Sequence, residues 1–250
     1  MRTANPALNP STFDTFDGYA IERSHTMTLN GTATKTGMLL ILLAASAGYS
    51  WMELRGAGGM QAVMPKFLGG LAVSLIAGIA LWFKRDWAPI LAPVYAVAEG
   101  LVLGVISAAY DQRFQGIVFQ AICLTFGTLF SLLTAYRTGL IKPTENFKLG
   151  VFAATGAIAI LYLVNMIMHM CGIGGVPFLH GSSPLAIGIN AVIVIVAALN
   201  LVLDFDFIEQ GVAHGAPKYM EWYAGYGLLV TLVWLYIEIL RLLSKIKSRD

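Results

Sequence analysis

Charged side chains are scarce in this sequence of 250 residues. Asp, Glu, Lys and Arg together make up 12% of the chain, whereas hydrophobic residues make up 57%, and the mean hydropathy is +0.71. Soluble globular domains carry roughly 25% charged residues, so this composition excludes an ordinary soluble domain and predicts a protein that crosses a membrane several times. The formal net charge of +2 is too small to indicate a nucleic-acid partner.

The sequence also lacks a disulfide framework and the common catalytic motifs. Its two cysteines, Cys123 and Cys171, lie in or beside apolar runs and cannot build a network of bridges. The four histidines form no His-Glu-x-x-His spacing, and no Gly-x-Ser-x-Gly or phosphate-binding Gly-Lys-Thr element is present. We therefore expect neither an enzyme nor a bound cofactor.

Seven apolar stretches of about 20 residues follow a polar N-terminal segment. They cover residues 37–53, 64–83, 87–110, 117–139, 146–172, 184–210 and 220–247. The connections contain helix breakers, such as "RGAGG" at 55–59 and "KPTEN" at 142–146. Residues 1–35 contain no apolar run typical of a cleavable signal peptide. The sequence thus predicts a polar segment over residues 1–35, followed by an all-α, seven-helix transmembrane domain over residues 36–250.

Lys and Arg residues are distributed unevenly between the two sides of the predicted bundle. Nine lie in the N-terminal segment and the second, fourth and sixth connections, against three around the first, third and fifth connections. Because cytoplasmic loops carry the excess of positive charge, we expect the N-terminal segment in the cytoplasm. Four cations near the other end of the chain would then lie outside, namely Arg241, Lys245, Lys247 and Arg249. A last helix that does not cross the membrane is the alternative.

Small residues in the third predicted span indicate helix packing. Gly100 and Gly104 form a Gly-x-x-x-Gly pair, and Ser107 continues the same helix face. Pro93 lies in the same span, where it removes one intrahelical hydrogen bond. We interpret this stretch as a close contact between two helix backbones.

Four ionisable residues fall inside the predicted spans, namely Glu99, Asp204, Asp206 and Glu238. A charge near the bilayer centre costs at least ~2.5 kcal/mol, so such residues are expected to face the bundle interior or a water-filled path. Asp204 and Asp206 lie ~200° apart around a helix and cannot both face one path. Asn200 lies one turn before Asp204, so we expect these two to face inward and Asp206 to reach the cytoplasmic interface. A protonated carboxyl that only hydrogen-bonds between helices is the alternative for each.

Several motifs, taken in their order, resemble the Bax-inhibitor family of seven-helix membrane proteins. The motifs near the end of the chain are "LDFDFIEQGVAHG" at 203–215 and "LYIEILRLL" at 235–243. Those nearer the start are "NPAL" at 5–8, "TMTLNGTATKTGMLL" at 26–40 and "VYAVAEGLVLG" at 94–104. The latter three are similar to the bacterial membrane branch of the family, which implies a location in a bacterial inner membrane.

The resemblance implies a pH-sensitive Ca²⁺ leak in which two carboxylates on the last two helices share a proton when closed and lose it when open. By local motif, Asp204 matches the first carboxylate and Glu238 the second, which makes them the candidate Ca²⁺ ligands, with Glu99 in support. Glu238 stands where the family usually has aspartate, and its separation from Asp204 is longer than the family pattern. The expected partners are the lipid bilayer, Ca²⁺ or protons, and other membrane proteins.

The expected depths of the carboxyls leave two arrangements open. At 1.5 Å per residue, Asp204 lies ~9 Å, Glu99 ~18 Å and Glu238 ~27 Å from the cytoplasmic ends of their predicted helices. A touching pair would share a proton and link two helices, whereas a ladder would offer successive weak oxygen sites to a cation or a proton. The alternative function is a non-conducting membrane scaffold that regulates protease or stress machinery.

Overall fold

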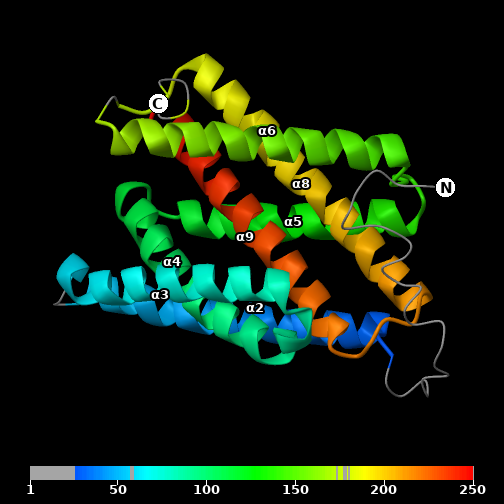
Figure 1. The fold of residues 1–250 in the computed structure, drawn as a ribbon. Coiled ribbons are helices and arrows are strands. Elements are labelled where there is room, and N and C mark those ends of the chain that lie inside the picture. The colour runs from blue at the N-terminus through cyan, green and yellow to red at the C-terminus, as the bar shows by residue number, and fades with distance from the viewer. Residues whose placement is uncertain (1–25, 57–58, 173, 177–178, 180, 250) are drawn as a thin grey trace.

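All seven predicted spans are continuous α-helices in the computed structural model, which describes residues 26–56, 59–172, 174–176, 179 and 181–249 (Figure 1). The helices are α2 (Leu29–Arg55), α3 (Gly59–Phe83), α4 (Ala88–Arg113), α5 (Ile117–Arg137), α6 (Glu145–Met170), α8 (Pro184–Ala213) and α9 (Met220–Lys247), and the short 3-10 helix η3 (Arg85–Trp87) precedes α4. Each of the seven is long and apolar enough to cross a membrane. The predicted all-α, seven-span class is therefore confirmed.

The first helix begins at Leu29, earlier than the predicted apolar stretch that starts at residue 37. The predicted polar segment 1–35 lies largely outside the described residues, and its final part forms the start of α2. Thr28 caps this helix by accepting the backbone N–H of Gly31 at 3.0 Å. The hydroxyls of Thr32 and Thr36 each donate to the backbone carbonyl four residues earlier, at 2.9 Å. The helix therefore extends beyond its apolar part, and its own backbone satisfies the hydroxyls of these two threonines.

Helix α9 forms the centre of the bundle, where it packs against α2, α4, α5 and α8 (Figure 1). Leu229, Leu235 and Leu240 on this helix are completely buried. Helix α6 packs mainly against α8. Glu238, on α9, is consequently buried among neighbouring helices.

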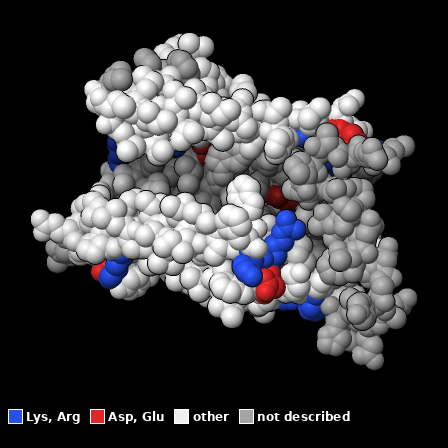
Figure 2. Space-filling view, viewed as in Figure 1, with Lys and Arg blue, Asp and Glu red and all other residues white. Residues whose placement is uncertain are grey.

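The outer surface of the bundle is mostly uncharged. Figure 2 shows one face on which Lys, Arg, Asp and Glu occupy only a few places among uncharged side chains. Large apolar side chains such as Trp82, Phe83, Ile90 and Phe119 are 72–80% exposed. Helices that satisfy their own backbone hydrogen bonds and turn apolar side chains outward suit a hydrocarbon surrounding. This protein is an integral membrane protein.

Helices α2 and α4 approach each other closely at the predicted small residues. A Cβ added to Gly104 would lie 2.8 Å from the carbonyl carbon of Ala47, and one on Gly100 would meet the α2 backbone one turn away. The Ser107 hydroxyl, on the same stretch, hydrogen-bonds the Tyr236 hydroxyl of α9 at 2.7 Å. The prediction of close helix packing is confirmed, because only glycine leaves room for the two backbones.

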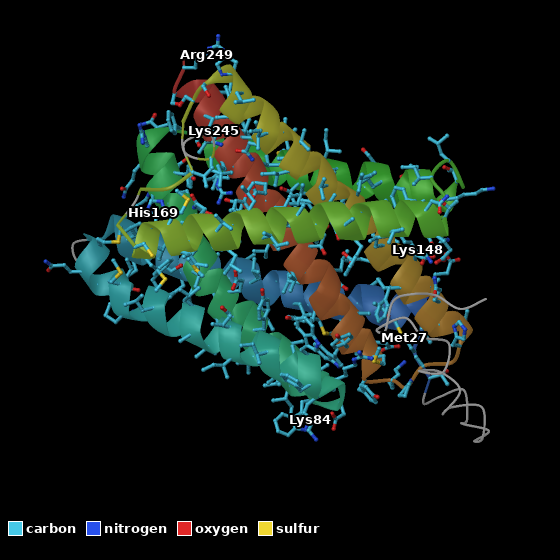
Figure 3. All side chains as sticks on the ribbon, turned by 45° about the horizontal axis from the view of Figure 1, so that its top comes forward. Met27, Lys84, Lys148, His169, Lys245 and Arg249 are labelled. Carbon is cyan, nitrogen blue, oxygen red and sulfur yellow. The ribbon has the colours of Figure 1, made fainter. Side chains whose placement is uncertain are left out.

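The beginning of α2 and the end of α9 lie at opposite ends of the bundle. Thr28, just before α2, contacts Glu221 in the first turn of α9, so both helices begin at the same end. Figure 3 shows Met27 at this end and Lys245 at the other. The 28 residues of α9 extend ~42 Å, enough to cross a hydrocarbon core of ~30 Å. This geometry favours seven crossings over a last segment that stays on one side.

Candidate functional site

Asp204 lies in the C-terminal half of α8 with its carboxyl toward α9. This carboxyl interacts with the hydroxyl of Thr231. The same hydroxyl can also donate to the backbone carbonyl oxygen of Gly227, which lies 3.3 Å from it. The Oδ2 atom of Asp204 is buried and has no hydrogen-bond partner among the described residues. A buried carboxylate needs a cation or hydrogen-bond donors to offset the loss of hydration. Ionisation of Asp204 would therefore favour a rearrangement around it.

Glu238 is 1% exposed and is bound from three helices. Its Oε1 accepts from the Tyr162 hydroxyl of α6 at 2.7 Å and from Nη1 of Arg241 at 2.9 Å. Its Oε2 accepts from Nδ2 of Asn190 on α8 at 3.0 Å. Because Arg241 supplies a positive charge, an ionised Glu238 is compensated where it lies. Glu238 is therefore a junction between α6, α8 and α9.

The two candidate Ca²⁺ ligands lie at different levels of the bundle. Asp204 meets Thr231, whereas Glu238 lies two turns farther along α9, a rise of ~10 Å. The structure thus does not bring Asp204 and Glu238 into contact, so the touching pair is not formed. No group of three or more His, Cys, Asp or Glu side chains in the described ranges is placed to hold a metal ion.

Glu99 lies half-buried in α4 and interacts with the hydroxyl of Ser74 on α3. One turn earlier, the ring of Tyr95 packs edge-on against Tyr226 of α9, with ring centroids 4.8 Å apart. Across the part of the chain that the structure describes, Glu99 and Asp204 have no cationic partner, unlike Glu238. These two carboxyls are the ones whose charge is left uncompensated when they ionise.

Asp206 and Asn200 both contact α6. Asp206 forms an ion pair with Lys148, near the start of α6, with an N–O distance of 2.8 Å. This position is consistent with the expectation that Asp206 reaches an interface. Nδ2 of Asn200 donates to Oγ1 of Thr155 at 2.9 Å, although we expected Asn200 to face the same way as Asp204. The structure directs Asn200 toward α6 and Asp204 toward α9, so it does not bring them together.

A further buried carboxylate, outside the predicted set, lies in the first turn of α9. Glu221 is completely buried and accepts from the backbone N–H and the hydroxyl of Thr28, both at 2.9 Å. It also pairs with Lys35 and, at 2.9 Å, with Lys218. We call Thr28, Lys35, Lys218 and Glu221 the N-terminal clamp, because they join the start of α2 to the start of α9. Sequence reasoning missed Glu221 because it lies at the edge of a predicted span.

Sequence reasoning also missed most of the polar partners of these carboxyls. They are Ser74, Tyr162, Asn190, Thr231 and Arg241. Only ionisable side chains were expected to be energetically unfavourable within the apolar runs, so uncharged polar side chains were not predicted as partners. The same burial argument applies to Asn190 within "AIGINAVIVIV" at 186–196. Arg241 was detectable from its position three residues after Glu238, the spacing of side-chain pairs on a helix.

Comparison with known proteins adds a family relationship to this geometry. A family model described as Bax inhibitor 1 like matches residues 5–248. No curated protein and no solved structure gives a significant match. The match spans all seven helices and every carboxyl discussed above.

Proposed function

The chain belongs to the Bax inhibitor 1 like family, and from this premise we propose that it is a pH-sensitive cation leak, with Ca²⁺ as the expected ion. The observation that carries the proposal is the Asp204 carboxyl, whose Oδ2 is buried without a partner in the described structure. Glu238 and Asp206, in contrast, each pair with a cation. A change in the charge of Asp204 therefore alters the forces between α8 and α9 more than a change at a paired carboxyl would.

The proposed opening begins with the loss of a proton from Asp204. The resulting carboxylate attracts water or a cation, because neither Thr231 nor the surrounding apolar core compensates its charge. The contact between α8 and α9 loosens at this level, while the hydrogen bond from Asn190 to Glu238 holds the two helices together ~10 Å farther along. Asp204 and Glu99 then each supply a weak oxygen site, which suits passage of a cation rather than lasting binding.

Ca²⁺ flux into liposomes that contain only the purified protein tests this proposal. We expect entry of Ca²⁺ to be faster in alkaline than in mildly acidic buffer, because deprotonation of Asp204 opens the path. A Ca²⁺-sensitive dye inside the liposomes measures the rate, and protein-free liposomes give the background leak. Background rates at every pH, with insertion of the protein verified, would contradict the leak and favour the non-conducting scaffold.

We further propose that the N-terminal side of the bundle faces the cytoplasm of a bacterial cell and that α9 ends outside. The uneven distribution of Lys and Arg supports this orientation, and the opposite placement of Thr28 and Lys245 supports an odd number of crossings. Fusions at each end to reporters active on one side of the membrane alone measure the orientation. Cytoplasmic activity at both ends would contradict the seven-crossing arrangement.

A further inference from the structure

A polar cavity of about 630 Å³ lies near the end of the bundle where α9 finishes. Residues of α4, α6, α9 and the segment before α8 surround it. Three lining residues are cations, namely Arg113, Arg241 and Lys245, and none of the described lining residues is a carboxylate. The hydroxyl groups that line it belong to Tyr110, Tyr162, Ser182, Ser244 and Ser248.

Two of these three cations have no ion-pair partner in the described part of the chain. Lys245 is 7% exposed, and its ammonium has one described hydrogen-bond acceptor, the carbonyl oxygen of Ala186 at 3.4 Å. The guanidinium of Arg113 lies over the ring of Phe114, 5.4 Å from its centroid. An ammonium carries three donors, so a single long hydrogen bond compensates it poorly when it is buried. The cavity therefore holds an excess of positive charge.

The beginning of α8 adds to this positive potential. Ser182 lines the cavity, and the next residue, Ser183, caps α8 by accepting the backbone N–H of Ala186 at 3.2 Å. A helix of 30 residues carries a partial charge of about +0.5 at its N-terminus. The contact between Lys245 and Ala186 shows that the first turn of α8 adjoins the buried cation.

We propose that this cavity binds a phosphate group, carried by an anionic lipid headgroup or present as free phosphate. Phosphate oxygens accept hydrogen bonds from guanidinium, ammonium and hydroxyl groups, which are the donors gathered here. A bound phosphate supplies the negative charge that Lys245 and Arg113 lack within the described chain. The proposal does not depend on the cation leak, although two residues that line the cavity, Tyr162 and Arg241, also bind Glu238.

The phosphate site accounts for cations that the positive-inside rule leaves unexplained. Arg113, Arg241 and Lys245 belong to the end of the bundle that the positive-inside rule, with the N-terminal side in the cytoplasm, expects to be poor in Lys and Arg. In the structure all three line one cavity, and Arg241 in addition pairs with Glu238. A shared binding site therefore gives these three cations a role that membrane orientation does not.

Two measurements on the full-length protein distinguish the sources of phosphate. In nanodiscs of phosphatidylcholine, calorimetry measures the binding of inorganic phosphate. In nanodiscs that also contain phosphatidylglycerol, native mass spectrometry measures the lipid retained by the protein. We expect binding in at least one setting, with dissociation constants about tenfold higher in Lys245→Gln and in Arg113→Gln, because each loses a charged hydrogen bond.

Arg249→Gln is the matched control, because Arg249 is an exposed cation at the same end of the bundle that does not line the cavity. It should bind phosphate as the unmodified protein does. Without phosphate, a cooperative thermal unfolding transition in Lys245→Gln checks that this variant is folded. Phosphate should then raise the unfolding midpoint of the unmodified protein more than that of Lys245→Gln. Absence of binding in both settings, or equal binding by the unmodified protein, Lys245→Gln and Arg113→Gln, would overturn the proposal.

Discussion

Asp204→Asn is expected to remove most of the pH dependence of Ca²⁺ flux and to leave the rate low at every pH. Asparagine keeps the size and hydrogen-bonding capacity of the side chain but cannot ionise, so it mimics the protonated carboxyl beside Thr231. The ionised fraction of a single carboxyl changes by about tenfold per pH unit on the acidic side of its midpoint. Liposome flux across mildly acidic to alkaline buffers should show this rise in the unmodified protein and a flat profile in the variant.

Asp206→Asn is the control for this experiment. Asp206 lies two residues farther along α8, but it pairs with Lys148 of α6 instead of facing α9. Its pH profile should resemble that of the unmodified protein. If Asp204→Asn inserts correctly and retains the original profile, Asp204 is a structural hydrogen-bonding group and another carboxyl must sense pH.

Glu238→Gln is expected to destabilise the bundle by about 1.5–3 kcal/mol, the range for a hydrogen bond to a charged group. The substitution leaves Arg241 without a counter-charge and weakens the links of α9 to Tyr162 and Asn190. The Arg241 side chain is 33% exposed, so the loss should be smaller than the ~3–5 kcal/mol that follows the breaking of a fully buried pair. Thermal unfolding in detergent measures the change.

The pair of Glu145 and Lys148, in which the carboxylate is exposed and Lys148 keeps Asp206 as a second partner, provides a control. It has the same spacing of three residues, with an N–O distance of 3.4 Å, but the Glu145 side chain is 71% exposed. Glu145→Gln should therefore change stability by at most about 1 kcal/mol. A double variant, Glu238→Gln with Arg241→Gln, should lose less than the sum of the two single losses, because no charge is left unpaired. Additive losses would show that Glu238 and Arg241 act independently.

The seven helices were predictable because apolar runs of about 20 residues are long enough to stand out from their connections. The residues at which the helices begin and end were less predictable, since they depend on local contacts. Helix α2 starts at Leu29 because Thr28 caps it by accepting the backbone N–H of Gly31. The hydroxyl of Thr32 donates to the backbone carbonyl of Thr28 in the same turn. Helix α8 continues to Ala213, past the predicted end at residue 210.

The sequence identified the carboxyls whose burial in the membrane is unfavourable, but not the side chains that bind them. Burial of Glu238 followed from its place in an apolar run, yet Tyr162 and Asn190 lie 76 and 48 residues away in the chain. Helical spacing placed Asn200 and Asp204 on the same face of α8. That face contacts both α6 and α9, however, and Asn200 points toward α6 whereas Asp204 points toward α9. Such choices depend on how the helices cross, which no local pattern specifies.

The N-terminal clamp has a consequence for biogenesis. Thr28 and Glu221 are 193 positions apart, so the clamp closes only after the first turn of α9 has been synthesised. Until then Lys35, on α2, lacks the carboxylate that it pairs with in the folded bundle. The start of α2 is therefore joined to the bundle only when the start of α9 arrives, and a chain that ends before residue 221 cannot form the clamp.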